Sequence, residues 1–150
     1  MQCSFLVVLF FGALHSAIAV ADTKAEAIKK DRKLIEGTWR IVALEVNGDK
    51  VGAEGFSVVN GSDGTWSLLY EGREISKGTS TLDPTKKVKC IDFTEAEGTG
   101  KGSQYIGIYE LGEKTRKLCF AEAGGDRPTK FVSIPGSKIT LVTFEREKAK

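Results

Sequence analysis

From Gly37 onward, apolar and polar residues alternate along short segments that are separated by turn-forming residues at nearly even intervals. A period of two indicates β-strands, and this regular spacing is typical of an antiparallel meander. No connection is long enough for a crossover helix, and a sheet of so many antiparallel strands must close to hide its edges. The pattern therefore predicts an all-β, up-and-down barrel of eight or nine strands over residues 37–150, with strands at 38–46, 55–60, 64–71, 73–82, 88–94, 103–111, 115–121, 129–134 and 138–146.

The first 21 residues contain no Lys, Arg, Asp or Glu, and their apolar run, residues 5–14, is too short to span a bilayer. Small residues at Ala19 and Ala21 form an A-x-A cleavage site. We therefore expect residues 1–21 to be a signal peptide cleaved after Ala21, and the protein to be secreted or periplasmic without a membrane span. Cleavage after Ala17-Ile18-Ala19 and a buried N-terminal helix are the alternatives.

Residues 22–36 precede the first expected strand. Thr23 and Glu26 have the spacing of a capping box and are followed by good helix formers, so we expect a short helix over about 24–35 that leads into the barrel. The basic stretch at 29–33 is interrupted by Asp31 and is interpreted as a solvated helix face.

Charge and composition limit the chemistry. With 22 basic and 20 acidic residues and no block of like charge, the chain offers no electrostatic reason to expect a nucleic acid partner. Cleavage after Ala21 would remove the one histidine and the one methionine. Because histidine is the usual general base and the commonest metal ligand, we expect no Ser-His-Asp, Cys-His or His-zinc site, no metal and no cofactor. We expect a monomer.

The tripeptide Gly-Thr-Trp occurs twice, at 37–39 and at 64–66, but the residues that follow the two copies do not match. We therefore do not interpret it as a repeat. Gly37 follows the expected helix and permits a sharp junction into the first strand. Gly64 is interpreted as the exit of a hairpin turn and Trp66 as an early core residue of its strand.

Gly37, Trp39 and Arg146 together resemble the signature of lipocalins and the wider calycins, which implies that Trp39 closes the barrel base and that Arg146 packs across it. A closer resemblance, over about 34–146, is to an uncharacterised lipocalin-like domain family of secreted planctomycete proteins. It is carried by GTWRIVALEVNG (37–48), STLDPTKKVKCIDFT (80–94), YIGIYEL (105–111), LCFA (118–121) and RPTKF (127–131). The resemblance implies a lipocalin-like barrel and no established activity.

A barrel of this kind has an interior that alternate residues of each strand can line. We expect Trp39, Ile41, Ile91 and Leu118 to point inward. The candidate ligand-binding residues of the interior are Trp66, Leu68, Tyr70, Phe93, Tyr105 and Phe120.

Three other groups could carry chemistry. Cys90 and Cys119 lie on strands with one strand between them, so their Cα atoms should be about 10 Å apart, whereas a disulfide needs about 4.4 to 6.8 Å. We therefore expect two separate thiols. Asp92 and Glu110 are a possible carboxylate pair, interpreted as part of a solvated outer face. The glycine-rich segment 97–105 lacks the P-loop pattern and is interpreted as a hairpin loop.

These observations favour a noncatalytic barrel that binds a small, mainly apolar molecule. The alternative is a protein-interaction or protease-inhibitor barrel, in which residues 22–36 and 95–103 would make the contacts. An enzyme is not expected.

Overall fold

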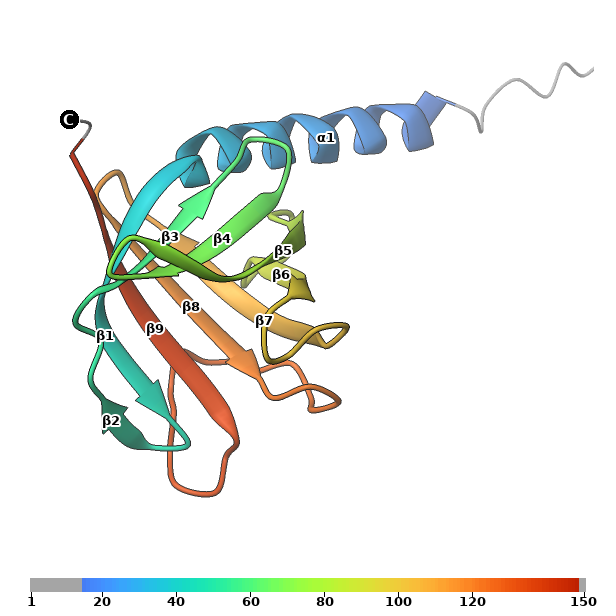
Figure 1. Cartoon of the computed structure of the whole chain (residues 1–150). Coiled ribbons are helices and arrows are strands. Elements are labelled where there is room, and N and C mark those ends of the chain that lie inside the picture. The colour runs from blue at the N-terminus through green and yellow to red at the C-terminus, as the bar shows by residue number, and fades with distance from the viewer. Residues whose placement is uncertain (1–14, 149–150) are drawn as a thin grey trace, which may run out of the picture.

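The computed structural model describes residues 15–148, so most of the predicted signal peptide lies outside the described residues. One helix precedes nine strands (Figure 1). The elements are α1 (His15–Ile35), β1 (Gly37–Val46), β2 (Asp49–Val51), β3 (Phe56–Asn60), β4 (Thr65–Tyr70), β5 (Arg73–Asp83), β6 (Cys90–Glu97), β7 (Gln104–Leu111), β8 (Thr115–Ala121) and β9 (Ile139–Arg146).

The strands form a closed antiparallel barrel. Neighbours along the chain pair in the order β1-β3-β4-β5-β6-β7-β8-β9, and β9 pairs with β1 to complete the ring. The short strand β2 pairs only with the end of β1, as the second arm of a hairpin. The predicted up-and-down barrel is therefore confirmed, with eight strands in the ring and β2 as an addition.

The predicted strand at 129–134 is wrong. This segment belongs to the long connection between β8 and β9, and it lies against the outer face of the barrel. Arg127 donates a hydrogen bond of 2.7 Å to the carbonyl of Gly107, and the Cys119 thiol lies 3.4 Å from the carbonyl of Lys130. Because β9 pairs with both β8 and β1, the ring has no free edge here for another strand to join. The connection instead covers the outward-facing Cys119, which is fully buried.

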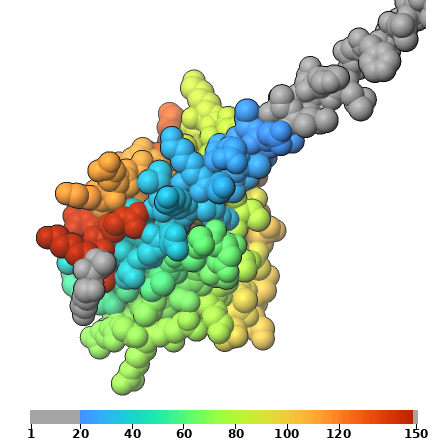
Figure 2. Space-filling view, turned by 90° about the horizontal axis from the view of Figure 1, so that it is seen from above, coloured from blue at the N-terminus to red at the C-terminus, as the bar shows by residue number. Residues whose placement is uncertain are grey.

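The helix α1 is longer than predicted and begins at His15 instead of near residue 24. Thr23 is inside the helix, where its hydroxyl donates a hydrogen bond of 2.8 Å to the carbonyl of Val20, so it does not form the predicted cap. No glycine or proline lies between His15 and Thr23 to stop the helix. Figure 2, which views the molecule from above, shows α1 lying across one end of the barrel.

The prediction of a solvated basic face on α1 is wrong for two residues. Asp31 is only 3% exposed and accepts hydrogen bonds of 2.7 Å from both the Tyr109 hydroxyl and the Lys89 ammonium. Arg32 donates 2.8 Å to the hydroxyl of Ser80 and also bonds the Ser80 carbonyl. Asp31 and Arg32 therefore attach the helix to the barrel. Their burial is tolerated because each has hydrogen-bonding partners on the barrel.

The first Gly-Thr-Trp copy joins the helix to the barrel as predicted. Trp39 is fully buried, and its indole N–H donates 2.7 Å to the carbonyl of Ile35 at the end of α1. The guanidinium carbon of Arg146, on the neighbouring strand β9, lies 4.2 Å from the centre of the Trp39 ring. Gly37 has a φ of +113°, and a Cβ added there would lie 3.2 Å from a nitrogen of Arg146. Another side chain would be strained at this φ, and the arginine would have to shift slightly to make room for it.

The second copy has a different role. Gly64, with a φ of +92°, ends the turn between β3 and β4. In this turn the carboxylate of Asp63 accepts a hydrogen bond of 3.0 Å from the backbone N–H of Thr65. Trp66 then enters β4 with its ring partly buried. The first copy opens β1 after a helix and the second opens β4 after a hairpin turn, so the two copies are not a structural repeat.

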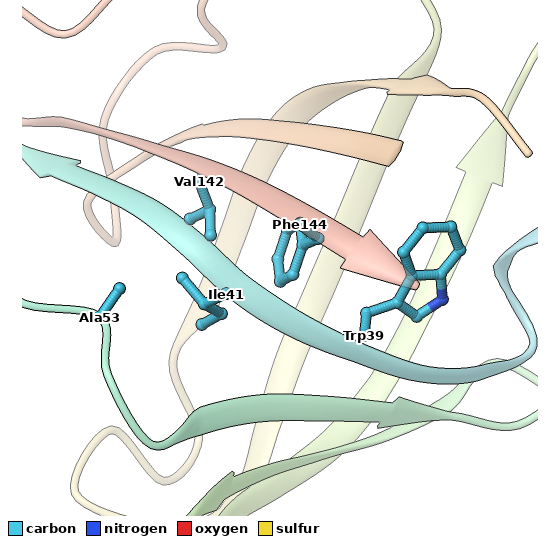
Figure 3. Packing of buried hydrophobic residues seen from close by; sticks show 5 residues of the cluster. All are labelled: Trp39, Ile41, Ala53, Val142 and Phe144. Carbon is cyan, nitrogen blue, oxygen red and sulfur yellow. The ribbon is translucent and has the colours of Figure 1, made fainter. Parts of the chain in front are cut away.

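The largest core cluster continues inward from Trp39. Figure 3 shows Trp39, Ile41, Phe144, Val142 and Ala53 packed along β1 and β9 and against the β2–β3 connection.

We predict that Trp39→Ala lowers the free energy of unfolding by about 3 to 5 kcal/mol, because it empties a buried aromatic site. Domains of this size are typically stable by about 5 to 15 kcal/mol, so the variant should be close to unfolding. Arg146→Ala should also lower stability through lost packing on the indole. Trp66→Ala is the matched control and should cost less, because this side chain is only partly buried. Denaturant midpoints followed by circular dichroism measure the effect. A midpoint for Trp39→Ala equal to that of the parent would contradict this account of the barrel base.

Candidate ligand cavity

The barrel encloses a cavity of about 440 Å³. All eight strands of the ring contribute to its wall, because alternate side chains of a strand point to the same face. On β8, for example, Arg116, Leu118 and Phe120 line the cavity, while Lys117 and Cys119 between them do not. The volume lies within the range of about 300 to 1,000 Å³ that is usual for small-molecule sites.

Most of the predicted interior residues lie where they were expected. Those of the candidate site that line the cavity are Trp66, Leu68, Phe93, Tyr105 and Phe120. Of the further residues expected to point inward, Ile41, Ile91 and Leu118 also line it, and Trp39 is buried in the core cluster.

Tyr70 is the exception and does not line the cavity. It is 43% exposed, and its ring packs on that of Phe56 with 4.8 Å between centroids. A register shift between Leu68 and Leu69 interrupts the regular pairing of β4 with β5, and Tyr70 is the last residue of β4. The extra residue at this shift is Ile75 of β5, and the pairing of β4 with β3 continues without a break, so Tyr70 stays on the same face as its partner Phe56. Tyr70 lies outside the cavity because it stands at the exposed end of β4.

Phe93 is the centre of an aromatic wall. Its ring stacks on Tyr105 at 5.0 Å and meets Phe120 edge to face at 5.0 Å and Trp66 edge to face at 6.0 Å. These contacts connect β4, β6, β7 and β8. Aromatic pairs in such geometries add to the energy of area burial, so this side of the cavity is a rigid apolar surface.

Ile35 and Tyr109 line the cavity at the end that α1 covers. The Tyr109 hydroxyl points away to Asp31, at 2.7 Å. Burial, together with this hydrogen bond, raises the pKa of Tyr109, so the phenol stays protonated and continues to donate. The floor of the cavity is therefore apolar on its inner side and hydrogen-bonded to the helix on its outer side.

Glu95 is a buried polar group at the other end of the cavity. Its carboxylate accepts 2.7 Å from the hydroxyl of Ser76. The β6–β7 loop folds closely around it: a Cβ added to Gly98 or Gly100 would lie 2.1 or 2.2 Å from a carboxylate oxygen. The space that Glu95 occupies thus explains Gly98 and Gly100, whereas Gly102 has a φ of +86° and no neighbour within 4 Å. The interpretation of 97–105 as a plain hairpin loop did not include this role of Glu95.

Arg116 is the inward residue that sequence reasoning missed. It is 7% exposed, and its guanidinium carbon lies 4.3 Å from the centre of the Phe144 ring and 5.3 Å from that of Trp39. Burial, and secondarily the charge of Arg146, lower the pKa of Arg116 to about 9. This value is above neutral, so the side chain remains charged at pH 7. Its position two residues before the inward Leu118 was the available signal.

The other groups that the sequence singled out lie outside the cavity. Asp92 pairs with Arg127 at 2.7 Å, and Glu110 pairs with Lys117 at 3.5 Å, so each carboxylate has its own cation. Cys90 and Cys119 are free thiols at one register level, separated by Ile108 on β7. Burial raises the pKa of Cys119, which keeps it protonated.

Within residues 15–148, no group of three or more His, Cys, Asp or Glu side chains is placed to hold a metal ion. The helix that the structure describes is not apolar over enough of its length to cross a membrane. In comparisons with known proteins, no family model, no curated protein and no solved structure matches this chain. The resemblance to lipocalin-like domains therefore remains a proposal.

We predict that Arg116→Met leaves the free energy of unfolding unchanged or raises it by up to about 3 kcal/mol, because replacing a buried charge by an apolar side chain of similar length removes a desolvation cost. The loss of its contacts with the two rings offsets part of this gain. Denaturant midpoints of the two proteins give the comparison. A loss of stability of more than about 1 kcal/mol would show that the arginine stabilises the fold.

Proposed function

We propose that this protein is a noncatalytic barrel that binds one small, mainly apolar molecule in its interior. The cavity of about 440 Å³ with walls from all eight strands of the ring carries the proposal. Protein interiors are normally close-packed, and small barrels are usually filled by their own side chains. A largely apolar space of this size inside a small barrel is therefore suited to hold a ligand. The rigid aromatic wall around Phe93 is a suitable surface for an apolar ligand.

The polar groups of the cavity support binding more than catalysis. The carboxylate of Glu95 accepts a hydrogen bond from Ser76, and Arg116 is at the opposite end of the interior. The carboxylates of Asp92 and Glu110, which sequence reasoning considered for acid-base chemistry, are paired with cations on the outside. Glycosidase-like catalysis needs two carboxylates facing one cleft, and of these three carboxylates only Glu95 lines the cavity.

Export of the protein is part of the proposal and is supported by the composition of residues 1–21. Cleavage after Ala21 would leave the part of α1 that is attached to the barrel through Lys24, which pairs with Asp83 at 2.9 Å, and through Asp31 and Arg32. The mature protein would thus keep the closed end of its barrel. We propose that it acts as a monomer of the lipocalin-like kind that its sequence resembles.

The alternative, a protein-interaction or protease-inhibitor barrel, has less support. Of the segments that would make the contacts, 22–36 buries Asp31 and Ile35 against its own barrel. The segment 95–103 is folded around the buried Glu95. Both segments are therefore already used to build the closed end and the far wall of the cavity.

We predict that the parent protein binds Nile red, an uncharged apolar dye, and that Leu118→Trp weakens binding at least about tenfold, because the larger side chain fills the cavity. Lys117→Trp is the matched control on the same strand, since Lys117 points outward and is exposed, and this variant should bind as the parent does. Dye fluorescence measures binding, and thermal melts by circular dichroism show that both variants are folded. A parent that binds no dye, or a folded Leu118→Trp variant that binds as well as the parent, would contradict the proposal.

A further inference from the structure

Arg116 is a charged side chain without a partner in an otherwise apolar part of the cavity. None of the ion pairs among the described residues includes it, and its Nε atom is buried with no hydrogen-bond partner. The rings of Trp39 and Phe144 that lie against it can attract a cation, but they accept no conventional hydrogen bond. Since a buried charge without a hydrogen-bonded partner is costly, this position calls for an occupant that accepts hydrogen bonds and carries negative charge.

A second unpartnered donor lines the same cavity. The side-chain nitrogen of Asn60, at the end of β3, is buried and has no hydrogen-bond partner among the described residues. The unmet groups of Arg116 and Asn60 are both N–H donors. Both therefore need an acceptor, whereas a cation or a purely apolar molecule would leave them unpaired.

The carboxylate of Glu95 does not supply this acceptor. Arg116 pairs in register with Leu111 on β7, and the backbone N–H of Glu95 bonds to Ser103 near the other end of that strand. The eight residue steps from position 103 to position 111 correspond to about 26 Å along the strand. Glu95 is also engaged with Ser76. The cavity thus has a cationic inner end near Trp39, an apolar middle, and an anionic end at the β6–β7 loop.

We infer that the ligand is an amphiphile with a single carboxylate, of the class of long-chain carboxylic acids, bound with its carboxylate against Arg116. The inference rests on the proposed function and names the ligand class for the same cavity. A guanidinium presents parallel donors that match a carboxylate. The hydrocarbon chain then runs along Leu118 and Phe120 toward the Phe93 wall. Glu95 at the far end disfavours a second carboxylate there.

The test measures displacement of Nile red from the full-chain protein by dodecanoate, by dodecan-1-ol and by dodecanedioate. We expect dodecanoate to displace the dye at a concentration about 10- to 100-fold lower than the alcohol of equal chain length, because only the carboxylate forms charge-assisted hydrogen bonds. The dicarboxylate should bind more weakly than dodecanoate, because its second carboxylate would lie near Glu95.

Variants assign the preference to Arg116. Arg116→Gln should abolish the preference for dodecanoate over the alcohol, expressed as the ratio of their displacing concentrations on the same variant, so that any change in dye affinity cancels. The matched control, Lys117→Gln, removes an exposed charge from the next position and should keep the preference. Arg116→Lys retains a charge without the paired donors and should show a reduced preference, which gives a second reading if the glutamine variant does not fold.

The outcomes separate the two proposals. Failure of the parent to bind Nile red would overturn the proposed function itself. If the parent binds the dye, but dodecanoate and the alcohol displace it at equal concentrations, the cavity binds apolar molecules and the inference of an anionic head group is wrong. A preference for the acid that persists in folded Arg116→Gln would also overturn the inference, because the carboxylate would then be bound elsewhere.

Discussion

The contact of Arg146 with Trp39 joins three parts of the chain at one end of the barrel. Arg146 is the last residue of β9, Trp39 lies near the start of β1, and the guanidinium donates hydrogen bonds to the carbonyls of Leu34 and Glu36 at the end of α1. The same two side chains therefore contribute both to closure of the sheet and to attachment of the helix. With this end closed by α1, the inward faces of the strands can surround a space that is separated from solvent on that side.

The two charged groups that line this space are satisfied to different degrees. The carboxylate of Glu95 has a hydrogen bond from Ser76 and a loop built around it. The guanidinium of Arg116 has aromatic rings against it and an Nε without a partner. Local rules of folding are most often broken at functional sites, where stability is given up for binding. The unpaired Arg116 breaks such a rule, and it makes the two ends of the cavity different. The end at Arg116 attracts an anion, and the end at Glu95 repels it.

Sequence reasoning succeeded where a single strand or turn decides the outcome, and failed where distant segments decide it. Alternation placed Leu68, Phe93 and Phe120 inside, because the side-chain period of a strand is a local property. It misplaced Tyr70, which shares a face with Phe56 but stands at the exposed end of β4, because how far the cavity extends along β4 depends on the other strands of the ring. It interpreted Asp31 as solvated, although the partners that make its burial possible come from β7 and the segment before β6.

The sequence by itself determined the order of the strands, the hairpin turns, the glycine at the junction before Trp39 and the pairing of that tryptophan with Arg146. Each of these follows from backbone sterics, from the two-residue period of a strand, or from the resemblance that its motifs carry. Only the tertiary structure decided that a space remains inside the barrel and that Arg116 faces it without a partner. The volume left by side chains from eight strands, and the partners available to a buried charge, depend on residues that closure of the ring brings together from distant parts of the chain.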